Sequence, residues 1–251
     1  MTVIAVLADP PREGLVLPEL AETSPLTEIE AAELYAAMSK DAFLAAERSG
    51  GDLLVNYRPD ELIPDAFAGE ESAEAEVRAL VADALGGTED VRFEVQVGST
   101  FDARAGNTAT HLLREEDVTS VAIVRGSAAF LTRTAIDSAA MKLRTNEVVL
   151  GPSTDGRVYY AGFTDAIDFD GAFAPPELET LAARATDAGH DAEFLPMQPV
   201  VERGEDLLHL LPVLEARVST RRIVPKHTTT LLRELGLRVD VDGGEPSVVR
   251  N

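Results

Sequence analysis

The 251-residue chain contains no cysteine, so it can form no disulfide, offers no thiolate nucleophile and builds no cysteine-based zinc or iron–sulfur site. It has only three lysines beside 19 arginines, and 44 acidic residues give it a formal net charge of -22. Because binding to a nucleic acid depends on clustered Lys and Arg, no nucleic-acid partner is expected. No run of about 18 apolar residues occurs, so we expect no membrane partner either.

The acidic residues are spread along the whole chain, which predicts that they cover a folded surface rather than form an acidic tail. Many Asp and Glu, few Lys and no Cys is a composition that resembles proteins of salt-loving archaea. Charges of one sign repel each other in dilute buffer, and salt screens that repulsion. We therefore predict a halophilic protein whose stability rises with salt into the molar range. The alternative is an ordinary acidic protein, for which no such gain is expected.

Apolar runs of strand length alternate with amphipathic helical patterns through most of the chain. This alternation is typical of a mostly parallel sheet covered on both faces, so the fold class expected is α/β, a three-layer α/β/α sandwich. Thr27 and Glu30 have the spacing of a capping box at the start of a long helix. Further helices are expected around residues 77–85, after Thr132, from Pro176, over 204–218 and over 226–235. Pro212 should kink the helix over 204–218 or split it in two. The expected strands are 3–8, 53–57, 91–97, 121–125, 147–150, 157–163 and 192–195.

The length and an apolar content of 45% favour one domain, which we place at residues 1–239. Residues 240–251 are rich in Gly, Pro and charge, and we expect a flexible C-terminal tail there. The first eight residues carry no positive flank and are followed at once by Asp9-Pro10-Pro11, so they read as a first strand rather than a signal peptide. A cytoplasmic location is therefore expected.

The most informative stretch runs from Val121 to Phe163, where two strands each open into a loop of small residues. In open α/β folds, ligands bind at the carboxyl ends of strands, where backbone N–H groups are accessible. The alternative is that the second loop is only a tight turn, for which Pro, Asp and Gly are the usual residues. The candidate ligand-binding residues in these loops are Gly126, Ser127, Gly151, Pro152, Asp155 and Gly156.

Other familiar site patterns are missing. The four histidines stand far apart, and none pairs with another at the i, i+4 spacing of a zinc-binding helix. No Gly-x-Ser-x-Gly elbow occurs, and no glycine-rich loop ends in the Gly-Lys-Ser/Thr of a Walker phosphate loop. Arg221-Arg222 with Lys226-His227 forms one local basic cluster, for which an anion or the acidic surface is an equally good partner.

The runs Val121–Ser127, Glu147–Gly156 and Tyr159–Phe163 resemble the glycosyltransferase-A-like proteins described as rSAM/selenodomain-associated transferases. That family is similar to 2-phospholactate guanylyltransferase and, more remotely, to nucleotide-sugar pyrophosphorylases. The resemblance extends to Val3–Leu20, which looks like the family's N-terminal phosphate loop and adds Arg12 and Gly14 to the candidate site. It implies a glycosyltransferase-A fold and a nucleotide or nucleotide sugar lying across the first strands. The phosphates of that ligand would be neutralised by Lys, Arg and a divalent cation, Mg or Mn.

The sequence departs from the family pattern at the positions that would carry charge. Where the family has its basic Lys-Thr-Arg run, this chain has Leu17-Pro18-Glu19, and Asp9 stands where a lysine is expected. Arg157 replaces the second glycine of the family's Asp-Gly-Gly. Two metal-linked positions also differ: Ala128-Ala129 stands where an aspartate is expected, and an aspartate pair is reduced to Glu202, with Asp206 one turn on.

These departures leave two functional hypotheses open. Transfer at phosphorus depends on positioning and on cations that absorb developing charge, each such group being worth about 10²-fold in rate or roughly 3 kcal/mol. In the first hypothesis the protein is a nucleotidyl- or glycosyltransferase in which Asp155 and Glu202 hold the metal. Arg12, Arg125 and Arg157 would then contact phosphate. In the second the protein is a non-catalytic relative that binds a nucleotide weakly without metal or acts as a partner subunit.

Overall fold

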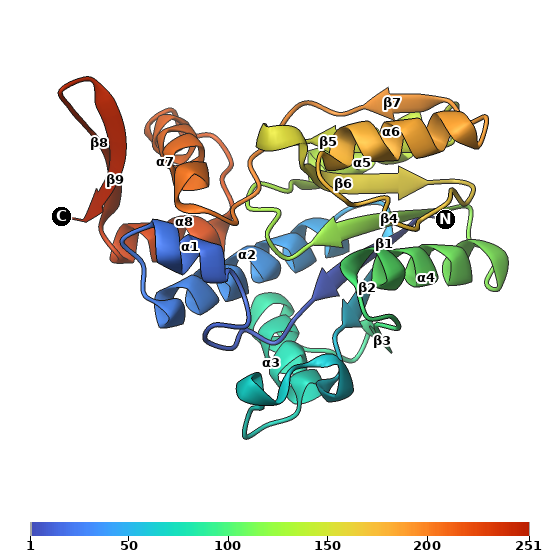
Figure 1. The fold of residues 1–251 in the computed structure, drawn as a ribbon, viewed down its shortest axis with the longest axis horizontal. Helices are drawn as coiled ribbons and strands as arrows, with labels where there is room; N and C mark the ends of the chain where they lie inside the picture. The colour runs from blue at the N-terminus through green and yellow to red at the C-terminus, as the bar shows by residue number, and fades with distance from the viewer. Residues whose placement is uncertain (1, 251) are drawn as a thin grey trace.

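The computed structural model describes residues 2–250, and a seven-stranded sheet forms its centre (Figure 1). The strand order is β3-β2-β1-β4-β6-β5-β7, and six strands run parallel while β6 runs antiparallel to both of its neighbours. This architecture confirms the expected α/β class with a mostly parallel sheet. The strands are β1 (Thr2–Ala8), β2 (Asp52–Tyr57), β3 (Arg92–Val95), β4 (Ser120–Arg125), β5 (Val148–Pro152), β6 (Val158–Phe163) and β7 (Ala192–Phe194).

Helices cover both faces of this sheet, as the sequence pattern predicts (Figure 1). Successive side chains of a strand point to opposite faces, so β1 contributes Ile4 and Val6 to one core and Val3 and Ala5 to the other. The first core is completed by α2 (Glu28–Glu47), α3 (Ala73–Leu85) and α5 (Arg133–Lys142). The second is completed by α4 (Phe101–Arg114) and α6 (Glu177–Asp187). Among residues 2–250, no helix combines the length and the apolar character needed to cross a membrane.

Local signals in the sequence account for where several helices begin. The predicted capping box at α2 is present: the Glu30 N–H donates to Thr27 Oγ1 at 3.2 Å, and the Thr27 N–H donates to Glu30 Oε2 at 2.8 Å. Thr132 caps α5 in the predicted way. Helix α4 was not predicted, although Thr100 caps it through the Ala103 N–H.

A third apolar cluster lies beside the sheet. It joins the first half of α2 to α1 (Pro18–Thr23), α7 (Gly204–Ser219) and α8 (Lys226–Glu234), on the left of Figure 1. Pro212 lies inside α7, which continues as one helix across it rather than splitting in two. The cluster also contains Ala129 and Phe130, which follow β4, so it packs α7 beside the carboxyl end of that strand.

The chain ends in an antiparallel hairpin of β8 (Leu237–Asp242) and β9 (Glu245–Arg250), in the segment predicted to be a flexible tail. Gly243 and Gly244 form the two-residue turn, and both have positive φ, as such hairpin turns require. Arg250 Nη1 donates to Glu30 Oε1 at 2.8 Å, which ties the hairpin to the start of α2. The hairpin is therefore regular structure, while the domain boundary at residue 239 stays a prediction.

Candidate functional site

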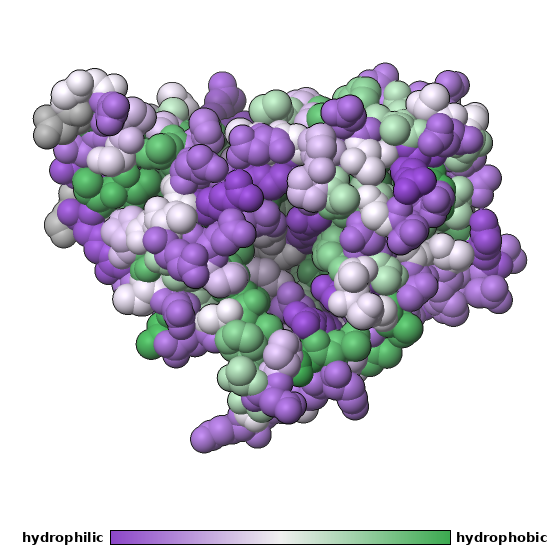
Figure 2. Space-filling view, viewed as in Figure 1, coloured by the Kyte–Doolittle hydropathy of each residue, from purple (hydrophilic) through white to green (hydrophobic). Residues whose placement is uncertain are grey.

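A cavity of about 450 Å³ opens at the carboxyl ends of β1 and β4. In the sheet, β2 and β3 follow on one side of β1, and β4 and the later strands lie on its other side. The strand order therefore reverses between β1 and β4, which is where open α/β folds bind ligands. The face seen in Figure 2 is hollowed near its centre, and mostly hydrophilic residues border the hollow. The crevice is lined by Leu7, Asp9, residues 15–19, Tyr35, Phe101, residues 125–127, Phe173, Pro175, Glu177, Glu202 and Arg203.

The loop after β1 contributes an apolar wall to the crevice. Leu15, Val16 and Leu17 line the crevice, and Glu19 follows them. Arg203 crosses to this wall, but its Nε donates to Glu19 Oε2 at 2.7 Å. The loop therefore presents no unpaired positive charge to the crevice through these residues.

Arg12 does not line the crevice, because its guanidinium is used elsewhere. It donates to Glu76 Oε1 at 2.9 Å, to the Phe67 carbonyl at 2.9 Å and to Asp60 Oδ1 at 3.2 Å. Gly14 adopts a φ of +70°, and a Cβ there would lie 3.0 Å from the Phe67 ring. Both residues thus fix the loop after β1 against residues 60–76, and their predicted role in ligand binding stays a prediction.

Gly126 and Ser127 lie in the crevice at the end of β4, where the sequence predicts them. A Cβ on Gly126 would lie 2.6 Å from Tyr35 Oη and 2.7 Å from Ser39 Oγ, so the close approach of α2 to the strand end requires glycine. Tyr35 Oη accepts the Asp9 N–H at 2.9 Å, and burial raises the pKa of Tyr35. Ser127 Oγ donates to Glu202 Oε1 at 3.0 Å.

Arg125 is the central cation of the crevice. Its guanidinium carbon lies 4.1 Å from the centroid of the Phe101 ring, a cation–π contact, and Phe173 packs edge-on against Phe101 at 5.1 Å. Nη2 contacts Glu177 Oε1 at 2.6 Å, and Nη1 contacts Glu202 Oε1 at 3.4 Å. Burial raises the pKa of Glu177, against the opposing effect of Arg125.

Asp9 adds a carboxylate to the crevice at the end of β1, where the resemblance leads one to expect lysine. Its Oδ1 is buried without a hydrogen-bond partner within residues 2–250, and the nearest cationic group is Arg58 Nη1 at 3.8 Å. Burial raises the pKa of Asp9, and Arg58 and Arg104 act in the opposite direction. Glu177 and Glu202 add two further carboxylates to the lining of the crevice.

The second predicted loop lies beside the crevice rather than in it. Asp155 has a φ of 58°, and a Cβ on Gly151 would lie 2.6 Å from the Tyr159 ring. A Cβ on Gly156 would lie 2.9 Å from Pro176, and the Ser153 N–H closes the loop by donating to the Arg157 carbonyl at 2.8 Å. The turn interpretation therefore accounts for Gly151, Pro152 and Gly156, and their contact with a ligand stays a prediction.

The two predicted metal ligands, Asp155 and Glu202, do come within reach of one group, but that group is Arg157. Arg157 Nη2 lies 3.4 Å from Asp155 Oδ2, and Nη1 lies 3.6 Å from Glu202 Oε2. Asp206 pairs with both Nη atoms. In addition, Ala128 is buried and supplies no ligand atom, and no three His, Asp or Glu of residues 2–250 are arranged to hold a metal ion. These residues do not fit a divalent cation while Arg157 is in place.

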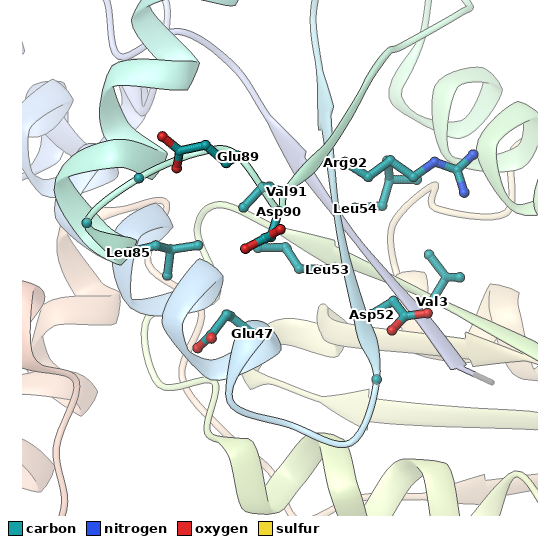
Figure 3. A pocket seen from close by; sticks show the side chains of 13 residues that line it. Val3, Glu47, Asp52, Leu53, Leu54, Leu85, Glu89, Asp90, Val91 and Arg92 are labelled. Atoms are coloured by element: carbon teal, nitrogen blue, oxygen red, sulfur yellow. The ribbon is translucent and has the colours of Figure 1, made fainter.

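A larger cavity, of about 620 Å³, lies at the opposite edge of the sheet, at the amino ends of β2 and β3 (Figure 3). Four carboxylates line it, from Glu47, Asp52, Glu89 and Asp90. Arg92 also lines it, but its Nη1 donates to Glu116 Oε2 at 2.8 Å. Open α/β folds bind ligands at the carboxyl ends of strands, so this cavity is not the candidate site.

Several residues of the crevice were missed in the sequence. Phe101, Phe173 and Glu177 come from segments far apart in the chain, and only the sheet order brings them to the end of β4. The one available signal was Pro175-Pro176 directly before α6, which fixes Glu177 at the first helical position facing Arg125.

Residues 57–175 match a family model. It is described as an uncharacterised protein family conserved in bacteria, DUF2064. In structure the chain is similar to a candidate nucleotide-diphospho-sugar transferase from Desulfovibrio desulfuricans G20, with 20% identity, 93% and 94% of the two chains covered and a TM-score of 0.74. It is also similar to 4-diphosphocytidyl-2C-methyl-D-erythritol synthase from Anaerococcus prevotii DSM 20548, with 12% identity, 86% and 96% covered and a TM-score of 0.51.

A comparison with curated proteins finds no match in sequence. At these identities the structural likeness shows the fold, which is that of nucleotide-diphospho-sugar transferases, as the resemblance in the sequence implied. A link to rSAM proteins and an origin in a salt-loving archaeon stay predictions.

Proposed function

We propose that this protein binds a nucleotide or nucleotide sugar in the crevice at the carboxyl ends of β1 and β4, and that it does so without a divalent cation. The observation that carries the proposal is the group at the end of β4, where Arg125, Gly126 and Ser127 face the crevice together. The fold shared with nucleotide-diphospho-sugar transferases supports the same location.

The walls of the crevice suit the neutral parts of such a ligand better than its phosphates. Phe101, Leu15 and Val16 offer apolar and aromatic surface for a base or a sugar face. Arg125 is preorganised by its contacts with Phe101 and Glu177, so it can meet one anionic group without losing side-chain freedom. Because carboxylates contact Arg125 and Glu19 pairs with Arg203, the affinity is expected to be modest and to favour ligands of low negative charge.

Ordinary transfer at phosphorus is not expected from this site. Such transfer relies on metal ions and basic groups that neutralise the developing charge, and here Arg157 lies between the carboxylates that would hold a metal. The alternative is a metal-dependent transferase, which the fold alone favours. The two proposals differ in whether Mg²⁺ or Mn²⁺ strengthens ligand binding.

The experiment is a thermal-shift screen of nucleosides, nucleotides and nucleotide sugars in molar KCl, with EDTA, with Mg²⁺ and with Mn²⁺. We expect at least one ligand to raise the melting temperature equally under all three conditions. Arg125→Met and Ser127→Ala should abolish the shift, whereas Arg133→Met, which alters an exposed arginine on α5 that pairs with Asp137, should retain it. A shift that appears only with metal supports the transferase instead, and no shift with any ligand contradicts nucleotide binding.

A further inference from the structure

We propose that a basic patch between α2, α5 and α8 is a docking site for an acidic segment of a partner protein, which inserts one aliphatic side chain into the cavity at its centre. The basic patch consists of Arg48, Arg133, Ile223 and Lys226, around a cavity of about 260 Å³. It shares no lining residue with the crevice, so it is a separate site, and its role does not depend on nucleotide binding.

The basic patch is positive although the chain has a net charge of -22. Three cations line the cavity, from Arg48, Arg133 and Lys226, beside the one carboxylate of Asp41. Asp41 is buried and accepts two backbone N–H groups at the start of α8, at 3.0 and 2.8 Å, so its charge is directed at that helix. The surface around the cavity is therefore complementary to an acidic partner.

The protein itself does little to neutralise these cations. Arg48 and Lys226 form no ion pair with any of residues 2–250. Asp83 acts on Lys226 only from beyond ion-pair distance, and it pairs with Lys40 at 2.5 Å. Arg133 pairs with a carboxylate on its own helix at 3.1 Å, but its side chain is 66% exposed, and such surface pairs contribute little. The charge of the basic patch is thus free to attract an external group.

Ile223 presents an aliphatic side chain beside these cations, on the connection between α7 and α8. Its exposed fraction of 81% is the highest of any large apolar side chain in the described range, 2–250. The connection is held in place, because the Arg222 N–H donates to the Arg217 carbonyl at 2.7 Å and Arg217 Nη1 donates to the Ile223 carbonyl at 3.3 Å. Arg221 and Arg222, the basic pair noted in the sequence, directly precede this isoleucine and are exposed.

The cavity suits one side chain better than a whole nucleotide. Pockets for small molecules have volumes of about 300–1,000 Å³, and this cavity is smaller. Its wall is apolar and comes from Leu44, Ala45, Leu131, Val224 and Pro225. An apolar centre with a charged rim is typical of protein–protein contacts, and one Leu, Ile or Val flanked by acidic residues matches both parts. A second copy of this chain fits less well, because two bodies of charge -22 repel each other.

The test offers the full-length protein a phage-displayed library of random decapeptides, in the lowest KCl concentration at which circular dichroism shows wild type to be folded. Selections are run on wild type, on Arg48→Glu with Lys226→Glu, and on the control Arg114→Glu with Arg144→Glu. The control makes the same change in net charge at two exposed arginines that do not line the cavity. The most enriched peptide is synthesised with fluorescein, and its Kd is measured by fluorescence anisotropy for these proteins and for Ile223→Ser.

We expect wild type and the control to enrich peptides in which several acidic residues flank one aliphatic residue. Charge reversal in the basic patch should weaken binding of the synthetic peptide by about tenfold or more. Ile223→Ser should weaken it by about threefold or more without lowering the melting temperature, because the side chain is exposed. Molar KCl should also weaken binding to wild type, since salt screens exposed charges. Arg48→Gln with Lys226→Gln is the second variant, used if charge reversal prevents folding.

Four results would overturn the proposal. The first is that wild type enriches no acidic peptides, and the second is that the patch variant and the control bind the synthetic peptide with the same Kd. The third is a wild-type dimer in sedimentation equilibrium that the patch variant dissociates, which would make a second copy the occupant. The fourth is release of the peptide by inorganic phosphate at the peptide's own Kd, which would indicate a simple anion site. None of these results bears on nucleotide binding, which the thermal-shift screen tests separately.

Discussion

The ion pair between Arg157 and Asp206 is buried, so removing one partner should destabilise the fold strongly, and Asp206→Asn tests this. Asp206 accepts Arg157 Nη1 at 2.9 Å and the two N–H groups at the start of α7. In the Asn variant the buried guanidinium loses its closest negative partner, and one amide oxygen replaces two carboxylate oxygens. Breaking a buried pair from one side costs about 3–5 kcal/mol.

Because Asp155 and Glu202 still contact Arg157, we expect the lower end, about 3 kcal/mol off the free energy of unfolding. For a chain of this size about 2–4 °C is lost per kcal/mol, so the melting temperature should fall by about 6–12 °C. The matched control is Glu205→Gln on the same turn, an exposed side chain 3.7 Å from Arg203. Exposed pairs of this kind contribute about 0–1 kcal/mol.

The same pair predicts a pH dependence. Burial alone would raise the pKa of Asp206, but the hydrogen bonds from Arg157 and from the N–H groups of Glu202 and Arg203 outweigh it and hold the pKa below its usual range. A lowered folded-state pKa gives stability that is present above the unfolded pKa, about 3.9, and is lost as pH falls through the folded value. The difference between wild type and Asp206→Asn should therefore be full at pH 7 and shrink below about pH 4.

The assay is urea and thermal unfolding of both variants and wild type, followed by circular dichroism at pH 7 and at pH 3–4 in constant molar KCl. The reasoning is refuted if Asp206→Asn loses no more stability than Glu205→Gln at pH 7. It is also refuted if the loss is as large at pH 3 as at pH 7.

Three further predictions concern the loop, the strand end and the surface. Gly126→Ala places a Cβ 2.6 Å from Tyr35 Oη, and we expect urea unfolding to show a loss of about 1–3 kcal/mol, whereas a neutral effect would contradict the close approach of α2. Arg12→Met removes hydrogen bonds to Glu76 and the Phe67 carbonyl, so it should lower the melting temperature and leave the affinity for a nucleotide unchanged. Weaker nucleotide binding with an unchanged melting temperature would instead show that Arg12 contacts the ligand. With a net charge of -22, the melting temperature of wild type should rise from low salt into molar KCl, and a flat response would remove the halophilic prediction.

Strand positions were predictable from the sequence because each buried strand is a short apolar run with breakers at its ends. The run predicted at 121–125 is β4 (Ser120–Arg125), and the run at 53–57 is β2 (Asp52–Tyr57). The antiparallel insertion of β6 between β4 and β5 could not be predicted, since a local pattern fixes a strand's existence but not its neighbours. The terminal hairpin was missed although Gly243-Gly244 is a turn signal, because the charged residues around it suggested a disordered tail.

The candidate site was predictable only in part, for a related reason. Gly126 and Ser127 directly follow a buried strand, so their place at its carboxyl end could be read from the chain. The direction of the Arg12 side chain depends on how residues 60–76 pack, which no local pattern encodes. Asp155 and Glu202 were predicted to hold a metal ion, and that role stays a prediction. Their contacts with Arg157 could not be predicted, because they follow only from the three-dimensional arrangement.

The most direct test of the account is the affinity of wild type for its best nucleotide-type ligand, measured by isothermal titration calorimetry in molar KCl with EDTA and again with Mg²⁺. If the ligand binds in the crevice without a divalent cation, as proposed, the Kd should be the same under both conditions, within about twofold. A Kd about tenfold or more lower with Mg²⁺, equivalent to about 1.4 kcal/mol of added binding free energy, would contradict it.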